Sequence, residues 1–343
     1  MLVDLTERIL DLSQSPLVVA EMSGNHGGSL QKALDLVQKA HECGADALKL
    51  QTYKPDTITV NGTCPRFKIQ SGLWKGRTLV DLYQEAMTPW DWHAEIAQKA
   101  RSLGMYCFSS PFDETAVDFL EKVLSPSVYK IASFELNHFP LLKKIGKLGK
   151  TVIASVGVSN DRDIKEALDV LRSNGTKDII LLHCVSEYPA EPKDFCLKKM
   201  PDLGRKHHVS FGLSDHSAGH LIATAATALG ARVIEKHFCL DRERSTIDGG
   251  FSMLPEEFSA MVQAVRETFL ALSGESLPTK PIFYKRSILV SEKIRDGDLL
   301  NEHNLRVARP GDGLCPSNWE FVLGKKAAKN MEVGHPLSEG DFF

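Results

Sequence analysis

The sequence has 343 residues, of which 43% are hydrophobic and 25% are charged, and its formal net charge is −3. These values are typical of a globular protein with a large core, and the length suits a barrel of about 250 residues followed by a smaller domain. The weak net charge and the lack of a basic stripe argue against nucleic acid or an anionic membrane surface as a partner, because both bind clustered Lys and Arg. A membrane-spanning helix needs about 20 consecutive apolar residues, and the sequence has no such run.

Short β-rich apolar runs alternate with helical segments over the first 275 residues. The runs cover residues 17–22, 47–53, 105–111, 128–133, 151–157, 178–186, 209–216 and 233–238. Strands so apolar must be covered on both faces, as parallel strands are. Eight of them with alternating helices predict an α/β fold, a closed TIM (β/α)8 barrel rather than an open doubly wound sheet.

Two segments interrupt this alternation. Residues 54–89 separate the second strand from its helix and are too long for a simple connecting loop, which predicts a functional role. Leu73, Trp74 and Tyr83 in this segment, with Trp90 just after it, predict an apolar and aromatic surface at the barrel mouth. A Pro-marked segment, 276–283, is the predicted linker between a catalytic domain, 1–275, and a small β-rich domain, 284–343. The small domain has too few residues to be firmly stable alone, so we expect it to dock on something.

The cysteines and the N-terminal segment predict a cytoplasmic protein. Seven cysteines lie far apart without a Cys-x-x-Cys pair, which is typical of reduced thiols rather than of a disulfide framework. The first 16 residues mix charged with apolar side chains and do not have the pattern of a secretory signal.

Polar residues gather where the predicted strands end. They are Glu21, Lys49, Gln51, Ser110, Lys130, Ser133, Glu135, Ser155, Ser186, Tyr188, Ser214, His216, Glu235 and His237. Catalytic groups of (β/α)8 barrels lie at the C-terminal ends of the strands. Polar tips on all eight strands are hard to explain by packing, so they predict an active site at this end of the barrel.

His216 and His237 are the candidate metal ligands. They end the seventh and eighth predicted strands, which are neighbours about 4.8 Å apart. Two imidazoles at adjacent tips can bind one divalent cation, with water or a carboxylate such as Glu21 or Asp248 completing the shell. We expect both imidazoles to face solvent. The alternative is that each is a core histidine satisfied by hydrogen bonds.

Lys49 and Lys130 point into the same predicted barrel mouth, among several serines. Two ammonium groups among hydroxyl donors suit a small, highly charged anion such as a phosphate ester. Buried lysines without an anion would need carboxylate partners, and Glu21 and Glu135 could supply them in an internal salt bridge. A Schiff-base lysine is a third possibility.

Several motifs together resemble one known family. The segments AEMSGNHGGSL, ADALKLQTY, CFSSPFD, YKIASFE, GLSDH and IEKHF, followed by RVARPGDGL, resemble the N-acetylneuraminate (sialic acid) synthase family in order and spacing, from about residue 16 to the end. The C-terminal part resembles the antifreeze-like (SAF) domain of that family. Within the family, residues 73–93, the segment CFSSPFDETAVDFL and residues 245–253 are most similar to the pseudaminic acid synthase branch.

The resemblance implies a reaction between phosphoenolpyruvate and an open-chain acetamido sugar. In the pseudaminic acid branch the sugar is 2,4-diacetamido-2,4,6-trideoxy-L-altrose. A divalent cation, Mn²⁺ or Mg²⁺, on His216 and His237 polarises the sugar aldehyde, which C3 of phosphoenolpyruvate attacks. Water then adds at C2 and phosphate leaves.

The resemblance also implies roles for individual residues. Phosphoenolpyruvate is expected to contact Lys49, Ser110, Lys130, Ser133, Ser155, Ser186 and Ser214. Glu21, Gln51, Tyr188 and Asp248 are expected to face the sugar and the attacking water, with Glu135 near the reacting carbons. Arg309 resembles the one residue that the SAF domain sends into the barrel of the partner subunit, so we expect a domain-swapped homodimer.

Two other functions stay open. A neuraminate or legionaminate synthase would differ only in its sugar. A non-catalytic sugar-binding protein could keep the barrel and the tail, although such a protein has no use for the paired lysines and histidines.

Overall fold

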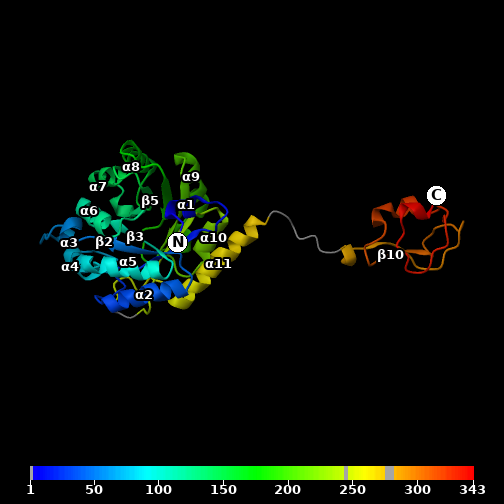
Figure 1. The fold of residues 1–343 in the computed structure, drawn as a ribbon, viewed down its shortest axis with the longest axis horizontal. Coiled ribbons are helices and arrows are strands. Elements are labelled where there is room, and N and C mark those ends of the chain that lie inside the picture. The colour runs from blue at the N-terminus through cyan, green and yellow to red at the C-terminus, as the bar shows by residue number, and fades with distance from the viewer. Residues whose placement is uncertain (1–2, 243–245, 275–281) are drawn as a thin grey trace. The chain divides into compact units, whose positions relative to one another are not determined.

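The computed structural model describes residues 3–242, 246–274 and 282–343 (Figure 1). The chain divides into two compact units, Met1–Ser273 and Gly274–Phe343, and each is described by itself. Residues 276–281 of the predicted linker lie outside the described residues, as does Ser245 at the start of the motif 245–253. The end of the linker belongs to a short 3-10 helix, η6 (Ile282–Tyr284).

Eight parallel strands form the centre of the first unit. They are β1 (Leu17–Glu21), β2 (Ala47–Thr52), β3 (Tyr106–Pro111), β4 (Val128–Ile131), β5 (Thr151–Ser155), β6 (Ile179–Cys184), β7 (Ser210–Asp215) and β8 (Val233–His237). Their order is β3-β2-β1-β8-β7-β6-β5-β4, and β3 also contacts β4, so the sheet is a nearly closed barrel. The predicted (β/α)8 barrel is therefore confirmed, and each strand lies within its predicted run.

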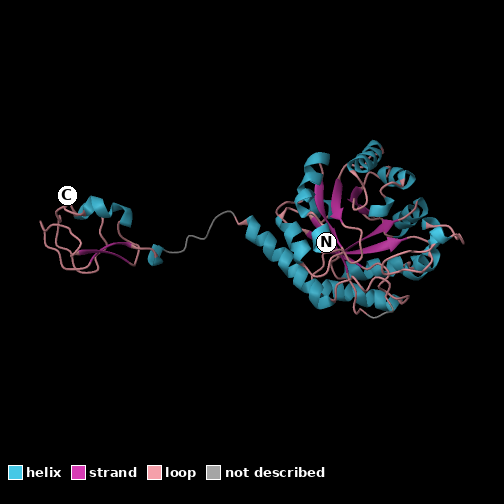
Figure 2. Ribbon diagram, turned by 180° about the vertical axis from the view of Figure 1, so that it is seen from behind, coloured by secondary structure: helices cyan, strands magenta, loops and turns pink. Residues whose placement is uncertain are grey.

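Helices cover the outside of this barrel (Figure 2). They are α2 (Leu30–Glu42), α5 (His93–Ser102), α6 (Glu114–Val123), α7 (Phe139–Gly146), α8 (Asp161–Ser173), α9 (Met200–His207), α10 (Leu221–Ala228) and α11 (Pro255–Ser273). In α2 the Ser29 hydroxyl caps the N-terminus, accepting from the N–H of Lys32, and Gly44, with φ +87°, ends the turn that follows. None of the described helices combines the length and apolar character needed to cross a membrane.

The barrel interior changes from apolar to polar along each strand. Leu17, Val19, Ala47, Phe108, Val128, Ile153, Ile180, Leu182 and Val233 belong to one buried cluster, together with Leu5 and Ile9 of α1 (Leu5–Leu10). Because side chains on one face of a strand recur every second residue, Lys49 and Gln51 follow Ala47, and Glu235 and His237 follow Val233, on the inward face. The interior is crowded enough that a Cβ on Gly212 would lie 2.4 Å from the Val233 carbonyl oxygen.

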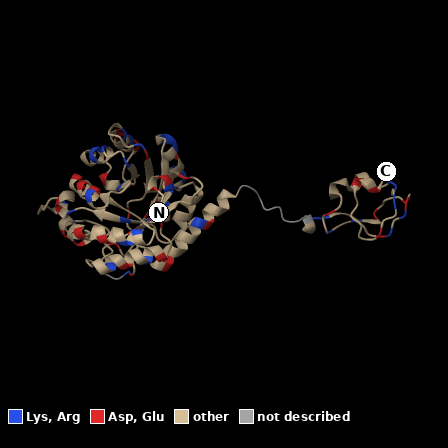
Figure 3. Ribbon diagram, viewed as in Figure 1, with Lys and Arg blue, Asp and Glu red and all other residues tan. Residues whose placement is uncertain are grey.

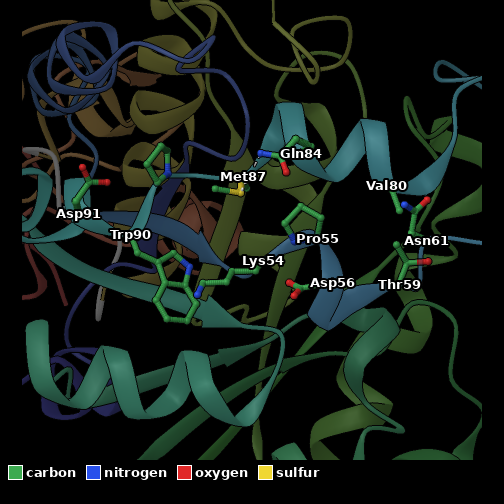
Figure 4. A pocket seen from close by; sticks show the side chains of 11 residues that line it. Lys54, Pro55, Asp56, Thr59, Asn61, Val80, Gln84, Met87, Trp90 and Asp91 are labelled. Atoms are coloured by element: carbon green, nitrogen blue, oxygen red, sulfur yellow. Dashed lines mark hydrogen bonds between the residues drawn. The ribbon is translucent and has the colours of Figure 1, made fainter.

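Residues 54–89 form a structured insertion after β2. They contain α3 (Pro55–Ile58), η1 (Pro65–Phe67) and α4 (Leu79–Ala86), and η2 (Trp90–Trp92) follows. The insertion borders a pocket of about 570 Å³ (Figure 4), lined by Lys54, Pro55, Asp56, Thr59, Asn61, Val80, Gln84, Met87, Pro89, Trp90 and Asp91. No predicted site residue lines this pocket.

The second unit has its own small core. β9 (Ser287–Val290) and β10 (Leu305–Ala308) form an antiparallel pair, and α12 (Trp319–Val322) follows η7 (Pro316–Asn318). The buried residues are Ile288, Val290, Ile294, Leu300, Leu305, Val322, Ala327, Met331 and Leu337. Isolated bridges, such as Ile294 with Met331, extend the pairing.

Charges of both signs are interspersed over the helices of the first unit (Figure 3). On α8, Arg162 pairs with Glu166 and Lys165 pairs with Asp169, each four residues apart. Such exposed pairs contribute little stability, because water and salt screen the charges. This distribution agrees with the weak net charge of the sequence.

Candidate active site

A cluster of buried charges lies at the C-terminal ends of the barrel strands, with Glu235 of β8 at its centre. Oε1 of Glu235 accepts hydrogen bonds from Nζ of Lys49 at 2.8 Å, Nζ of Lys130 at 3.3 Å and Oγ of Ser214 at 3.1 Å. Nζ of Lys49 also lies 2.9 Å from Oε2 of Glu21. The strands β1, β2, β4, β7 and β8 thus bring together the two lysines predicted to bind an anion.

The lysines have internal carboxylate partners, as one of the predicted alternatives required. Glu21 is a partner of Lys49 as expected, but the carboxylate shared by both lysines belongs to Glu235, not to Glu135. Burial lowers the pKa of Lys49 to about 7, although Glu235 opposes the shift. Burial alone would raise the pKa of Glu235, but the ammonium groups of Lys130 and Lys49 outweigh burial and lower it. Two ammonium groups therefore face two carboxylates.

The predicted serines differ in how far the protein satisfies them. Oγ of Ser110 and Oγ of Ser155 are buried and have no hydrogen-bond partner within the described part of the chain. The Ser133 hydroxyl accepts from the N–H of Val158 at 3.1 Å, and Oγ of Ser186 lies 3.8 Å from the sulfur of Cys184. Buried polar atoms are nearly always satisfied. The hydroxyls of Ser110 and Ser155 are therefore available to a polar ligand.

The two histidines lie side by side, with ring centroids 5.3 Å apart. Nδ1 of His216 is 2.9 Å from the carbonyl oxygen of Val185, so Nδ1 carries the proton and Nε2 keeps its lone pair. Burial lowers the pKa of His216 to about 4 and the pKa of His237 well below its usual value. Both rings are only 5% and 8% exposed. The expectation that they face solvent is wrong, because the loops after β6 and β8 enclose them.

Two neutral imidazoles can supply two nitrogen ligands to one metal ion. Nδ1 of His237 is buried without a partner in the described residues. The carboxylates considered as further ligands are engaged, since Glu21 pairs with Lys49 and Asp248 accepts from the hydroxyl of Ser23. No group of three or more His, Cys, Asp or Glu in the described chain is arranged around one metal position. The residues fit a cation whose remaining ligands are oxygens of substrate or water.

A second network joins three of the predicted sugar-facing residues. Nε2 of Gln51 donates to Oε1 of Glu21 at 3.1 Å and to Oγ of Ser23 at 3.0 Å. The Ser23 hydroxyl in turn donates to Oδ2 of Asp248. Burial raises the pKa of Asp248, and the hydrogen bond from Ser23 opposes this shift. These residues come from β1, β2 and the loop after β8, and Ser23 holds them together.

Aromatic rings form a wall beside the histidines. The ring of Tyr188 lies 4.4 Å from the ring of His216 and 4.9 Å from that of Phe251. The indole of Trp74, from the insertion, lies 5.7 Å from Tyr188, and its N–H donates to the carbonyl oxygen of Ile247 at 3.1 Å. One side of the site is therefore closed by the insertion.

Of the other aromatic residues expected at the mouth, Trp90 packs elsewhere. Its ring lies 4.5 Å from the ring of Phe119 on α6, and its N–H donates to the carbonyl oxygen of Tyr53. Tyr83 makes an edge contact with Tyr53 at 6.0 Å. Both residues attach the insertion to the barrel, whereas Leu73 is 52% exposed.

Two more predicted residues have distinct environments. Glu135, in η3 (Ser133–Glu135), is half-buried, and burial raises its pKa to about 7 while Lys130 opposes the shift. Arg309 belongs to the second unit, is exposed, and donates from Nε to the carbonyl oxygen of Tyr284 at 2.7 Å. The raised pKa suits Glu135 to act as a general acid or base near neutral pH. Arg309 lies in the second unit and so is not part of the cluster that the barrel strands form.

The sequence gives no role to Ser23, Glu235 and Phe251. Glu235 is among the predicted polar strand ends, and its place two residues before His237 puts it on the same inward face of β8, but the pattern does not predict that both lysines contact it. Ser23 and Phe251 lie in loops, where no period indicates which way a side chain points. Only their contacts with Asp248 and with the histidines identify them.

Comparisons with known proteins identify relatives of this chain. The chain is 42% identical over 330 residues to a pseudaminic acid synthase of Campylobacter jejuni, covering 95% of this chain and 96% of that protein. It is 34% identical over 332 residues to an N,N'-diacetyllegionaminic acid synthase of the same species, covering 94% and 99%. The crystal structure of an N-acetylneuraminic acid (sialic acid) synthetase from Leptospira borgpetersenii, in complex with citrate, is similar with a TM-score of 0.69 and 28% identity, covering 78% of this chain and 88% of that one.

Family comparison covers both units. Residues 36–276 match the NeuB family, and residues 285–342 match the SAF domain. The predicted family and the predicted C-terminal domain are therefore confirmed. The two synthases of Campylobacter jejuni match nearly the whole chain. This chain belongs to the NeuB family of sialic acid synthases and carries a C-terminal SAF domain.

Proposed function

We propose that this enzyme condenses phosphoenolpyruvate with 2,4-diacetamido-2,4,6-trideoxy-L-altrose to give pseudaminic acid and phosphate. The observation that carries the proposal is the group of Lys49, Lys130 and Glu235 beneath two buried, neutral histidines. The identity of 42% with a pseudaminic acid synthase supports this branch over the legionaminic acid branch, at 34%.

Phosphoenolpyruvate would bind between the two lysines and the free hydroxyls. Lys49 and Lys130 supply cationic donors, and Ser110 and Ser155 supply hydroxyls that have no partner in the described protein. When the phosphate binds, it competes with Glu235 for the ammonium groups. Charge-assisted hydrogen bonds of this kind are about twice as strong as neutral ones, so in this proposal the lysines bind the substrate through their charge.

His216 and His237 would hold a divalent cation, Mn²⁺ or Mg²⁺. Such a cation polarises the sugar aldehyde as a Lewis acid. The hydrogen bond from His216 to the Val185 carbonyl oxygen fixes the ring and leaves Nε2 as the metal-binding nitrogen. The ammonium groups and carboxylates of Lys49, Lys130, Glu21 and Glu235 cancel in charge. A cation would therefore also offset part of the charge of a phosphate, which is about −2.

Glu135 and Asp248 would accept and donate the protons that are transferred when water adds to C2 and phosphate leaves. Water adds to C2 after C3 of phosphoenolpyruvate has bonded to C1 of the sugar, and the adduct then expels phosphate. A carboxyl group with a pKa of about 7, as at Glu135, can accept the proton from water or give one to the leaving group at neutral pH. Asp248 is joined to Gln51 through Ser23 and faces the sugar in this proposal.

Phosphate release tests the proposal directly. The enzyme is incubated with phosphoenolpyruvate, Mn²⁺ and either the trideoxy altrose or N-acetylmannosamine. Rapid release with the altrose supports the proposal. Equal or faster release with N-acetylmannosamine assigns the enzyme to the neuraminate branch, and no release with these or a legionaminate precursor supports the sugar-binding alternative.

A variant control separates the anion site from a Schiff base. Lys49→Met and Lys130→Met keep the side-chain stems and remove the charge, so we expect the KM for phosphoenolpyruvate to rise about 10-fold or more, with a smaller effect on the KM for the sugar. Borohydride with pyruvate should trap no adduct on the parent enzyme. A trapped adduct at either lysine would favour an aldolase instead.

A further inference from the structure

Ser23, in the loop after β1, has a backbone conformation that glycine adopts with least strain. Its φ is +46°, in the left-handed region where the Cβ of an L-residue crowds the backbone. The side chain is 4% exposed, so it does not serve solubility. Ser125, Cys196 and His208 share this conformation, so the backbone alone does not mark a function, and the hydrogen bonds of the Ser23 side chain carry the argument.

The Ser23 hydroxyl both donates and accepts a hydrogen bond. Oγ donates its single proton to Oδ2 of Asp248 and accepts a hydrogen bond from Nε2 of Gln51 at 3.0 Å. The backbone N–H of Ser23 donates to Oε1 of Glu21 at 3.0 Å, and the same oxygen accepts from Nε2 of Gln51 at 3.1 Å. Four residues from three segments are thus joined in one network.

This network decides which atoms remain for a ligand. Both hydrogens of the Gln51 amide are directed to Ser23 and Glu21, so the orientation of the amide is set and its carbonyl oxygen is the free acceptor. Asp248 is held at Oδ2 by Ser23 and is also bound by the backbone of Gly24. Without the hydroxyl, Gln51 can turn its amide and Asp248 loses a donor in a buried setting.

We propose that Ser23 is a positioning residue whose hydroxyl orients Gln51 and Asp248 toward the acceptor sugar. The inference rests on the proposed function, because it takes the sugar as the ligand of both side chains. It assigns the requirement at this position to the hydroxyl and not to the backbone conformation, which glycine would satisfy better.

Two variants separate the hydroxyl from the backbone. Ser23→Gly and Ser23→Ala both remove the hydroxyl, but only glycine relieves the left-handed strain, so Ser23→Gly should have the higher Tm of the two. Both should lower kcat/KM for the sugar by about 10- to 100-fold, as expected for lost hydrogen bonds to charged groups. The KM for phosphoenolpyruvate should change by less than about twofold, because the lysine cluster is untouched.

A double-mutant cycle then tests the path through Asp248. In the Asp248→Asn background, Ser23→Gly should cost less than it does in the parent, because only the hydrogen bond with Gln51 is then left to lose. Additive losses, or parent-like kcat/KM for the sugar in Ser23→Gly, would overturn the role of Ser23 while leaving an active synthase. A parent enzyme that releases no phosphate with any acetamido sugar would instead overturn the proposed function and this inference with it.

Discussion

Glu135 is a residue whose environment sets its protonation close to neutral pH. Burial raises its pKa from 4.5 to about 7. If Glu135 is the base of the water step, kcat of the parent should rise as pH increases through about 7, and Glu135→Gln should lose this rise and about 100-fold in kcat. The pH profile of kcat, measured at saturating substrates, checks this. A profile unchanged in Glu135→Gln would exclude Glu135 as the base.

The same residue affects stability in a direction that can be calculated. Because the folded pKa is raised, the folded state keeps a proton that the unfolded state has released, and this contribution is fully present below pH 4.5 and is lost as pH rises through about 7. Glu135→Gln stays neutral at every pH. Its Tm relative to the parent should therefore be higher at pH 8 than at pH 5, and the reverse order would contradict the raised pKa.

At the same scale, the two histidines make metal binding testable without turnover. Both rings are buried, so alanine would leave a cavity, and His216→Asn or His237→Asn is the better change. We expect each to weaken Mn²⁺ binding by about 10-fold or more, measured by calorimetry. EDTA should abolish activity of the parent, and Mn²⁺ or Mg²⁺ should restore it. His41→Ala, on the exposed face of α2, is the matched control and should bind metal like the parent. Full activity after exhaustive chelation would remove the metal from the proposal.

At the scale of an element, the insertion of residues 54–89 brings apolar surface to the site through Trp74. A substrate with a methyl at C6 offers more apolar contact than N-acetylmannosamine, and contacts of this size are worth about 1–3 kcal/mol of discrimination. Trp74→Ala should therefore reduce the preference for the altrose by about 5- to 100-fold when the two sugars compete at equal concentration. Trp74→Phe keeps a ring and should keep most of the preference.

Trp90 provides the control for the same element. It packs on Phe119 and not on the site, so Trp90→Ala should lower the Tm without changing the choice between the sugars. If Trp90→Ala alters selectivity as much as Trp74→Ala, the insertion acts only as a scaffold and Trp74 has no direct contact with the sugar.

At the scale of the whole molecule, we propose that the SAF domain completes the site of a partner subunit through Arg309. Exposed apolar side chains near the barrel mouth, Leu73, Phe134 and Val158, are 52%, 58% and 54% exposed and offer a surface for such docking. An enzyme of this kind should be a dimer by light scattering. A monomer with full activity would contradict the proposal.

Mixed dimers test the exchange itself. At a phosphoenolpyruvate concentration well below the raised KM of Lys49→Met, Arg309→Ala and Lys49→Met should each have low activity alone, but co-expression should restore part of the activity. In a mixed dimer, one barrel keeps Lys49 and receives Arg309 from the other chain. Arg309→Ala mixed with an Arg309→Ala, Lys49→Met double variant is the control and should stay inactive. Equal activity in both mixtures would contradict domain swapping.

The fold could be predicted from the sequence because its signals are local. The strands follow from short apolar runs, and the helices from a repeat of 3.6 residues such as that in α2, with Ser29 and Gly44 at its ends. The two-residue period of a strand also places Lys49 with Gln51, and Glu235 with His237, on one face. Since these periods act within a few residues, the sequence by itself determined the barrel and the end at which its polar residues gather.

The pairing within the site was decided only by the tertiary structure. Lys49 and Glu235 are 186 residues apart, and Ser23 and Asp248 are 225 residues apart. Which carboxylate a lysine contacts depends on strand order, register and side-chain length around the barrel, so the sequence could not distinguish Glu135 from Glu235. The burial of the histidines likewise depends on loops that follow other strands. Local periods carry no information about such contacts, because residues far apart in the sequence meet only when the barrel has folded.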